Sequence, residues 1–356
     1  MALKFVRATV RAMDGYTPGE QPPSGARVVK LNTNENPFPP SPRVLQAIRE
    51  IEPESLRRYP SPHADAFCEV AARVLGVSRD MIIAGNGSDD ILTIATRTFI
   101  PAGGLLAFPD PTYSLYSVLG RLQDARTKAV AWEPDWQLPI EGLLASGADA
   151  IYLANPNAPS GTFVAPAKVA ELARAFDGLL LVDEAYAEFA QDNCVSLVNE
   201  FPNVLVSRSL SKAYGLAGLR FGYAAAHADV IAEMMKVKDS YNCDAISIAA
   251  ASAALEDQDY ARRVWAEVVS ERRRLTEELE KLGWSVLPSE ANFVLAAVPG
   301  GRAKQAYLGL KEQGILVRYF DLPGLTDRVR ITVGTSQETN ALLGGIKALS
   351  VADKAA

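Results

Sequence analysis

Histidine and cysteine are scarce in this chain of 356 residues, which has two histidines, His63 and His227, and three cysteines. Neither histidine has a partner at a metal-ligand spacing. The cysteines Cys68, Cys194 and Cys243 lie far apart and are odd in number. This pattern argues against a zinc site and against a disulfide framework. We therefore expect no bound metal, reduced thiols and a cytoplasmic protein.

Long hydrophobic runs and an excess of positive charge are also missing. No charge-free stretch of 18 or more apolar residues is present, so we expect no membrane span. The first residues have neither the long apolar core nor the cleavage site of a signal peptide, which again favours the cytoplasm. A net charge of −6 gives no electrostatic reason to bind nucleic acid or an anionic membrane.

The composition that remains is that of a globular protein with two domains, one large and one small. Between residues 64 and 225, short apolar segments alternate with helical ones. We expect strands at 81–84, 105–108, 150–153, 179–182, 204–206 and 221–225. Helices are expected at 44–51, 64–75, 89–99 and 166–176. Nearly continuous apolar strands between helices predict a mostly parallel sheet with helices on both faces.

The character of the sequence changes after about residue 245. A long charged helix with apolar spacing is expected at 259–282. Short strands are expected after it, at 284–287, 292–295, 315–318 and 329–333. A long helix followed by several short strands predicts a smaller α+β domain after residue 245.

Three polar segments follow predicted strands directly. Residues 85–90 are rich in glycine and precede a helix, which is typical of a phosphate site but also of an ordinary helix cap. Residues 154–161 form either a simple Asn/Pro turn or a ligand-binding loop at the carboxyl end of a strand. Asp183 ends a buried strand, where a carboxylate can keep a pyridine nitrogen protonated or can cap the next helix.

A fourth segment is the most informative. Lys212 stands among small and hydroxyl residues directly after an apolar run, and Arg220 follows eight positions later. A desolvated, cation-rich pocket lowers the pKa of a lysine and makes it a nucleophile for an aldehyde cofactor. All four segments occur at strand ends. One shared ligand site explains this arrangement better than four unrelated helix caps and turns would.

Together these segments resemble the cofactor site of fold-type I aminotransferases and, within them, the histidinol-phosphate aminotransferase family. The resemblance extends from about residue 25 to 350. The segments that carry it are 31–37 (LNTNENP), 58–60 (RYP), 110–113 (DPTY), 183–186 (DEAY), 209–212 (SLSK), 314–318 (GILVR) and 328–335 (RVRITVGT). It implies an α/β fold of the fold-type I transferase kind, with a large, mostly parallel sheet domain and a smaller α+β domain. The implied limits are 1–30 for an N-terminal arm, 31–245 for the large domain and 246–356 for the small domain.

The resemblance implies pyridoxal 5′-phosphate as the cofactor and assigns its contacts. Lys212 forms the internal aldimine and moves a proton between the substrate Cα and C4′ of the cofactor. Asp183 pairs with the pyridinium nitrogen, Tyr186 donates to the phenolic oxygen, and Tyr113 stacks on the ring. The implied phosphate contacts are Gly87, Ser88, Asp89, Ser209, Ser211 and Arg220. Tyr59 reaches the cofactor phosphate of a neighbouring subunit, so the resemblance also implies a homodimer.

One position departs from the family pattern. Most relatives have asparagine directly before Pro-Thr-Gly, where this chain has Ala158. Asn157, one residue earlier, is therefore the candidate for the missing contact with the cofactor. Arg330, together with Arg318, is implied as the site for the glutamate carboxylate and for a substrate phosphate. Further substrate contacts are implied for Asn36 and Tyr59, and the pocket wall is expected to include residues 32–36 and Asn292.

The implied reaction converts L-histidinol phosphate and 2-oxoglutarate to 3-(imidazol-4-yl)-2-oxopropyl phosphate and L-glutamate, in a ping-pong sequence of histidine biosynthesis. Three alternatives stay open. The first is an aromatic amino acid aminotransferase, whose carboxylates the same arginines would serve. The second is a threonine-phosphate decarboxylase of the same fold, which needs no amino acceptor. The third, a sensor domain of a transcription factor, is disfavoured because Lys212 and Asp183 are both present and no DNA-binding extension is expected.

Overall fold

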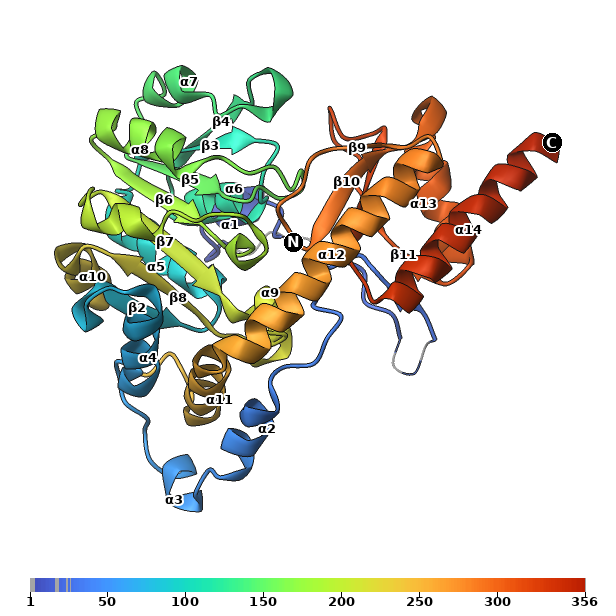
Figure 1. Cartoon of the computed structure of the whole chain (residues 1–356). Coiled ribbons are helices and arrows are strands. Elements are labelled where there is room, and N and C mark those ends of the chain that lie inside the picture. Colours follow the sequence, from blue (N-terminus) through green and yellow to red (C-terminus); the bar gives the residue numbers. More distant parts are fainter. Residues whose placement is uncertain (1–3, 17–18, 24, 26, 356) are drawn as a thin grey trace.

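The computed structural model describes residues 4–16, 19–23, 25 and 27–355, with side chains described up to residue 349. Residues 1–3, 17, 18, 24 and 26 of the predicted arm, and residue 356, lie outside the described residues. A large part built on one sheet and a smaller part built on another lie side by side, and the long helix α12 (Gln258–Lys281) runs along their junction (Figure 1).

The large part contains a seven-stranded sheet in the order β2-β8-β7-β6-β5-β3-β4. Its strands are β2 (Ile82–Gly85), β3 (Leu105–Asp110), β4 (Arg126–Ala131), β5 (Ala150–Ala154), β6 (Leu179–Asp183), β7 (Val204–Ser209) and β8 (Gly222–Ala226). The strands β3 to β7 run parallel, and β8 is antiparallel to both of its neighbours. The prediction of a mostly parallel sheet is therefore confirmed.

Helices cover both faces of this sheet, as predicted. One face packs against α4 (Asp65–Leu75) and α8 (Pro166–Ala175), and the other against α5 (Ser88–Phe99), α6 (Leu115–Leu122) and α10 (Ala228–Met235). Neighbouring residues of a strand point to opposite faces, so Ile151 joins the first core and Tyr152 the second. Every residue of β5, β6 and β7 is buried, which explains why their sequences read as continuous apolar runs.

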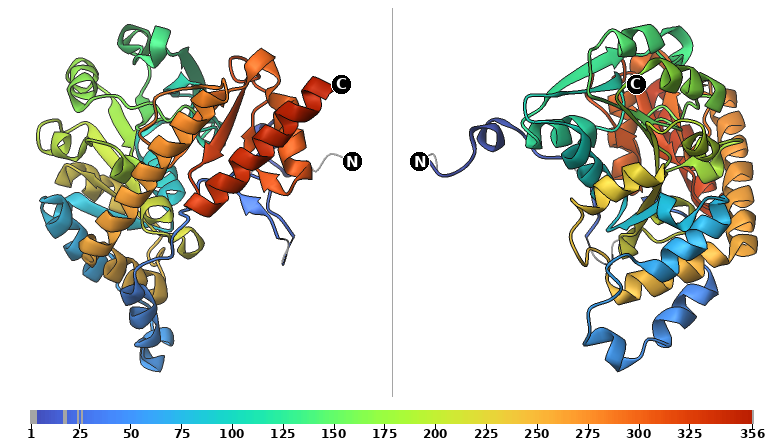
Figure 2. Two further views of the ribbon diagram at one scale, coloured as in Figure 1. Left: turned by 45° about the vertical axis from the view of Figure 1, so that its right-hand side comes forward. Right: turned by 90° about the vertical axis from the view of Figure 1, so that its left-hand side faces the viewer.

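The smaller part is built on a four-stranded antiparallel sheet in the order β12-β13-β10-β9. Its strands are β9 (Ser285–Val286), β10 (Phe293–Ala297), β12 (Arg318–Tyr319) and β13 (Arg328–Thr332). The helices α12, α13 (Ala303–Glu312) and α14 (Ser336–Ala355) belong to the same part (Figures 1 and 2). The strand predicted at 315–318 is divided into β11 (Ile315–Leu316) and β12, because the two pieces pair with different partners.

The N-terminal segment crosses to the smaller part before the chain enters the large one. The strand β1 (Val29–Lys30) pairs in parallel with β11. The Leu31 carbonyl then accepts a hydrogen bond of 3.0 Å from the Thr332 backbone N–H. These contacts, together with the hydrogen bond from Lys212 to the Thr33 carbonyl, place residues 31–35 between the two parts.

Two helices pack against elements from which the predicted domain limits separate them. The helix α11 (Ala245–Glu256) packs against α2 (Pro42–Arg49) and α4. The short helix α1 (Ala8–Ala12) lies against α6, where Arg7 and Thr9 both hydrogen bond to Asp124. The division at residue 245 stays a prediction. Within the part of the chain that the structure describes, no helix is long and apolar enough to cross a membrane.

Candidate active site

A pocket lies at the carboxyl edge of the parallel strands, where ligands bind in open α/β sheets. The large part lines it with Ser88, Asp89, Tyr113, Ala158, Asp183, Tyr186, Ser209, Ser211, Lys212 and Arg220. The opposite wall consists of Asn32, Thr33, Asn34, Arg318, Phe320 and Arg330. The structure therefore brings together most of the residues that the sequence predicted for the site.

Lys212 lies in the pocket on the short helix α9 (Leu210–Ala213), which follows β7 directly. The Ser209 hydroxyl caps this helix by accepting a hydrogen bond of 3.2 Å from the Ser211 backbone N–H. The Lys212 Nζ donates to the Thr33 carbonyl oxygen at 3.1 Å. Burial, together with the nearby Arg330 guanidinium, lowers the pKa of Lys212 from 10.5 to about 8. A lysine with such a pKa is a nucleophile and a proton carrier near neutral pH.

Asn36 supports this helix from behind rather than lining the pocket. Its side-chain Nδ2 donates to the carbonyl oxygens of Lys212 at 2.9 Å and of Ala213 at 3.2 Å. The Trp265 indole N–H on α12 donates to the same Ala213 carbonyl at 2.9 Å. The backbone that carries Lys212 is thus held by two distant segments of the chain.

Asp183 ends β6 and points its carboxylate into the base of the pocket. It accepts hydrogen bonds from the Tyr116 hydroxyl at 2.9 Å and from the Ser207 hydroxyl at 3.1 Å. Burial raises the pKa of Asp183 from 3.8 to about 6, although both hydrogen bonds act in the opposite direction. A cationic group beside this carboxylate would favour its ionised form. Tyr116 was not predicted for the site, because the helix α6 that carries it was not recognised in the sequence.

The predicted phosphate end of the pocket is formed by the start of α5 and by Arg220. Gly87 has a φ of +89°, and a Cβ atom on it would lie 2.8 Å from Nη2 of Arg220. Arg220 donates to the Ser211 hydroxyl at 3.2 Å and to an oxygen of Asp89 at 3.4 Å. Free backbone N–H groups at the start of a helix and a guanidinium beside them favour a phosphate group.

The two arginines of the smaller part lie on the opposite wall. The Arg330 guanidinium lies over the Phe293 ring at 5.2 Å and over the Phe320 ring at 5.5 Å. The Arg318 guanidinium lies over the same Phe320 ring at 5.5 Å. Arg330 donates to the Asn32 carbonyl at 3.0 Å, and its Nε finds no partner among the described residues. Phe320 was not predicted for the site, since a single phenylalanine in a loop carries no recognisable signal.

Two predicted cofactor residues lie outside the pocket. Tyr59 is 79% exposed and stacks on Tyr241, with ring centroids 4.4 Å apart. The Asn157 amide turns into its own loop, where it donates to the Pro111 carbonyl at 3.1 Å and to the Ser160 hydroxyl at 2.8 Å. Ala158 lines the pocket in its place. A contact between Asn157 and a cofactor therefore has no support in this arrangement.

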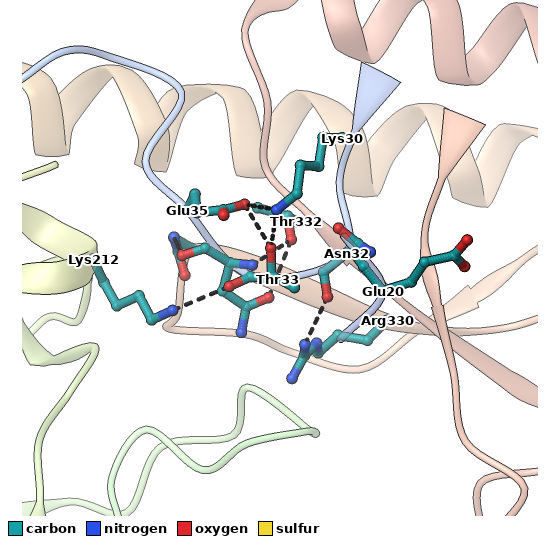
Figure 3. A network of polar contacts seen from close by, with 10 residues as sticks. Glu20, Lys30, Asn32, Thr33, Glu35, Lys212, Arg330 and Thr332 are labelled. Atoms are coloured by element: carbon teal, nitrogen blue, oxygen red, sulfur yellow. Dashed lines mark hydrogen bonds and ion pairs between the residues drawn. The ribbon is translucent and has the colours of Figure 1, made fainter. Parts of the chain in front are cut away.

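A network of polar contacts joins the two walls of the pocket (Figure 3). The side chains of Lys212 and Arg330 approach the segment 31–35 from opposite sides and bond to the carbonyls of Thr33 and Asn32. Lys30, Thr33 and Glu35 form a second cluster in which both other side chains donate to the Glu35 carboxylate. The segment 31–35 is therefore part of the active site, not only a linker before it.

The geometry of the pocket fits pyridoxal 5′-phosphate. The pocket offers a buried amine at Lys212, a buried carboxylate at Asp183 and the ring of Tyr113, whose hydroxyl donates to Asp89 of α5 at 3.1 Å. Gly87 has a left-handed φ of +89°, which side chains rarely adopt, and its backbone approaches the Arg220 guanidinium closely. An amine, a carboxylate and a phosphate cradle match the aldehyde, the ring nitrogen and the phosphate of that cofactor.

The fold and the site define a pyridoxal-phosphate-dependent transferase of the aminotransferase kind. The sequence matches the family described as Aminotransferase class I and II over residues 26–346, so the chain belongs to that family.

Within this family, the chain is similar to histidinol-phosphate aminotransferases. The chain is 44% identical to the histidinol-phosphate aminotransferase 1 of Trichormus variabilis over 345 residues, which is 97% of this chain and 99% of the relative. It is 45% identical to the histidinol-phosphate aminotransferase of Rhodopirellula baltica over 339 residues, 95% of this chain and 93% of the relative. The crystal structure of histidinol-phosphate aminotransferase from Sinorhizobium meliloti in complex with pyridoxal-5′-phosphate superposes with a TM-score of 0.89 at 28% identity, covering 98% of this chain and 99% of that one. The predicted family resemblance is confirmed.

Proposed function

We propose that this protein is a histidinol-phosphate aminotransferase that uses pyridoxal 5′-phosphate to move the amino group of L-histidinol phosphate to 2-oxoglutarate. The observation that carries the proposal is the position of Lys212, a buried lysine with a lowered pKa between the start of α5 and the Arg330 guanidinium. Close relatives that bear this name over nearly their whole length support the choice of substrate.

The cofactor, when bound, supplies an aldehyde that takes up the amino group and a ring that withdraws electrons from the reacting carbon. Its phosphate would be held by Ser88, the N–H groups at the start of α5, Ser209, Ser211 and Arg220. Asp183 would pair with the ring nitrogen, and Tyr113 would cover one face of the ring. Each of these residues lines the pocket.

Lys212 carries out the proton transfers in this proposal. Its amine is partly neutral near pH 8, so Nζ can accept a proton from the substrate Cα and return it after the amino group has moved. Without the cofactor, the hydrogen bond to the Thr33 carbonyl holds Nζ in the pocket. Enclosure of the pocket between the two walls limits the access of water to the reacting carbon.

Arg330 and Arg318 would bind the anionic end of both substrates. A planar guanidinium donates equally well to a carboxylate or a phosphate, so one site can serve glutamate and histidinol phosphate in turn. The Arg330 guanidinium lies over the rings of Phe293 and Phe320, and its Nε has no hydrogen-bond partner in the part of the chain that the structure describes.

We further propose that the protein works as a homodimer in the cytoplasm. Tyr59 and its stacking partner Tyr241 are exposed at 79% and 47% in the single chain. Leu45, Leu56 and Ile246 are also exposed, at 52%, 59% and 38%. A second copy that covers these side chains would bring Tyr59 to the phosphate end of its neighbour's pocket, where a phenolic hydroxyl can donate to a phosphate.

Subunit mixing tests the dimer. K212A lacks the reacting amine and Y59A lacks the hydroxyl offered to the neighbour, so each parent should have little activity. A mixed dimer contains one site with both groups intact, and the mixture should exceed the activity of either parent. Equal activity of mixture and parents, with mass photometry showing exchanged dimers, would refute the shared site.

The substrate is tested by a single half-reaction. The protein is loaded with pyridoxal 5′-phosphate, L-histidinol phosphate is added without a keto acid, and the visible absorption band is followed. We expect fast bleaching by histidinol phosphate, a weak response to L-phenylalanine, and no release of CO₂ from L-threonine phosphate. Efficient bleaching by phenylalanine alone would assign the protein to the aromatic aminotransferases, and a fully active K212A variant would refute the mechanism.

A further inference from the structure

The hydroxyl of Tyr186 has one hydrogen-bond partner among the described residues, and that partner is not in the large part. Its oxygen lies 3.0 Å from Nδ2 of Asn34, in the segment that crosses from the smaller part. Its ring also packs edge-on against Phe293 at 5.1 Å and lies against Ala158, and Arg330, Asp183 and Tyr16 lie close enough to act on its charge. The orientation of the Asn34 amide therefore determines whether the Tyr186 hydroxyl accepts or donates in this hydrogen bond.

Asn34 is held on three sides. It is 1% exposed and has a φ of +57°, a left-handed conformation that asparagine tolerates better than most residues. Its backbone N–H donates to the Thr332 hydroxyl oxygen at 3.0 Å, and its side-chain Oδ1 accepts from the same hydroxyl at 3.1 Å. Its carbonyl oxygen accepts from Nδ2 of Asn292 at 3.0 Å. The amide of Asn34 thus has a defined place between β13 and Tyr186.

The orientation of this amide follows from counting protons. The Thr332 hydroxyl has one proton to donate, and Thr332 is 3% exposed. With Oδ1 facing it, that proton is taken by Asn34, and the Nδ2 group is left to face Tyr186. With the amide reversed, the Thr332 proton would have no recorded acceptor among the described residues, and an unpaired buried donor is costly. The arrangement with Nδ2 toward Tyr186 leaves each of these groups paired.

The Tyr186 oxygen consequently accepts a hydrogen bond from Asn34, so its own proton is not used there. Tyr186 lines the pocket, and within the described part of the chain its hydroxyl forms no hydrogen bond other than the one with Asn34. We propose that Asn34, oriented by Thr332, is a positioning residue that keeps the Tyr186 O–H directed into the pocket as a donor to the phenolic oxygen of the cofactor. This inference rests on the proposed function, since it gives Tyr186 a defined task toward pyridoxal 5′-phosphate.

The substitution T332V tests the inference. Valine has nearly the shape of threonine but offers no hydroxyl, so Oδ1 of Asn34 loses its donor and the amide is free to reverse. A reversed amide turns Oδ1 toward Tyr186 and captures the proton that the cofactor would otherwise receive. A hydrogen bond to the ionised form of a group lowers its pKa, so its loss should raise the pKa of the cofactor chromophore.

The readout is the pH titration of the visible band of the loaded protein, with Y186F as the reference for complete loss of the donor. We expect T332V to raise the midpoint by about 0.5 to 1 pH unit, the size of one redirected hydrogen bond, in the same direction as Y186F. In the double variant Y186F/T332V the midpoint should equal that of Y186F alone, because Thr332 acts only through Tyr186. The matched control is T96V, which removes another buried hydroxyl, bonded to Tyr152 at 2.8 Å outside the pocket, and it should leave the midpoint unchanged.

A midpoint in T332V equal to that of the wild type, or a further shift in the double variant, would overturn the inference. If T332V does not fold, N34D gives the same test, because its carboxylate offers Tyr186 only an acceptor and should raise the midpoint at least as much. A wild-type protein without a visible band would instead refute the proposed function, so the two failures are distinguishable.

Discussion

The Lys212 amine should destabilise the cofactor-free protein at neutral pH, and replacing it with methionine should reveal by how much. Burial, with help from Arg330, lowers the pKa of Lys212 from 10.5 to about 8. That decrease corresponds to about 3 kcal/mol of unfavourable free energy for the protonated amine in the folded state. K212M keeps most of the apolar side chain but loses the hydrogen bond to the Thr33 carbonyl, which contributes about 1 kcal/mol. K212M should therefore raise the free energy of unfolding by about 2 kcal/mol.

The effect should depend on pH in a defined direction. Below about pH 8, Lys212 is protonated in both the folded and the unfolded state, so the folded protein carries the full cost. Between about pH 8 and 10.5, the unfolded chain keeps a proton that the folded protein has released, so wild-type stability rises with pH. The advantage of K212M should shrink across that interval and become a deficit of about 1 kcal/mol above it, where only the lost hydrogen bond to Thr33 remains.

Urea unfolding of the cofactor-free proteins at several pH values between about 7 and 10 measures this difference. The control is K168M on α8, whose exposed lysine pairs with Glu171 at 2.7 Å and which should change stability by less than about 0.5 kcal/mol at any of these pH values. A K212M protein that is less stable than the wild type at neutral pH, or whose advantage does not change with pH, would refute the reasoning.

Three further substitutions follow from buried groups of the site and the sheet beneath it. Burial raises the pKa of Asp183 from 3.8 to about 6, so the folded protein loses stability relative to the unfolded chain as the pH rises through that interval. Cofactor-free D183N should therefore be more stable than the wild type at pH 7 by up to about 3 kcal/mol. Equal stability of the two proteins in urea would contradict this expectation. Arg208 contacts the buried carboxylate of Glu184 at 2.7 Å. R208M leaves that carboxylate without a cation and should lower the free energy of unfolding by about 3 to 5 kcal/mol. A decrease below about 1 kcal/mol would show that the ion pair is dispensable. A158N offers the cofactor a polar side chain and should tighten pyridoxal 5′-phosphate binding about fivefold in equilibrium dialysis, whereas weaker binding would show that the wall beside Tyr186 has no room for it.

The central strands and the site at their ends could be predicted because their signals are local. The segments 150–153, 179–182 and 204–206 are continuous apolar runs, and the structure shows them as β5, β6 and β7 with every residue buried. Helices on both faces make such runs necessary, so the sequence alone reveals them. Parallel strands end at one edge, which is why polar residues after separate strands could be assigned to one pocket.

Several elements of the structure were not predicted from the sequence. The strand β4 at the edge of the large sheet reads RTKAVA and alternates between exposed and half-buried residues, so it resembles a polar connection. The helices α6, α10 and α13 were not predicted either, and Tyr116 was missed with α6. Local patterns could not show that this tyrosine would reach across to Asp183.

Contacts between residues far apart in the sequence limited the prediction of the site more than any element boundary. The bonds between Asn34 and Thr332 join positions that are 298 residues apart, and only the crossing of residues 29–35 to the smaller part brings them together. The predicted role of Asn157 depended in the same way on a loop conformation, because its amide turns toward the Pro111 carbonyl while Ala158 faces the pocket. Neither arrangement has a signature in spacing or residue type.

The segment 31–35 explains how two separately built walls can act as one site. The carbonyls of Leu31, Asn32 and Thr33 accept in turn from the Thr332 backbone, from Arg330 and from Lys212. The first two donors belong to the smaller part and the third to the large part, so the segment fixes the distance between the anion site and the reacting amine. A ligand that draws Arg330 or Lys212 away from these carbonyls removes a bond from the same short stretch of backbone. One short stretch of backbone thus carries a hydrogen bond to each wall of the pocket.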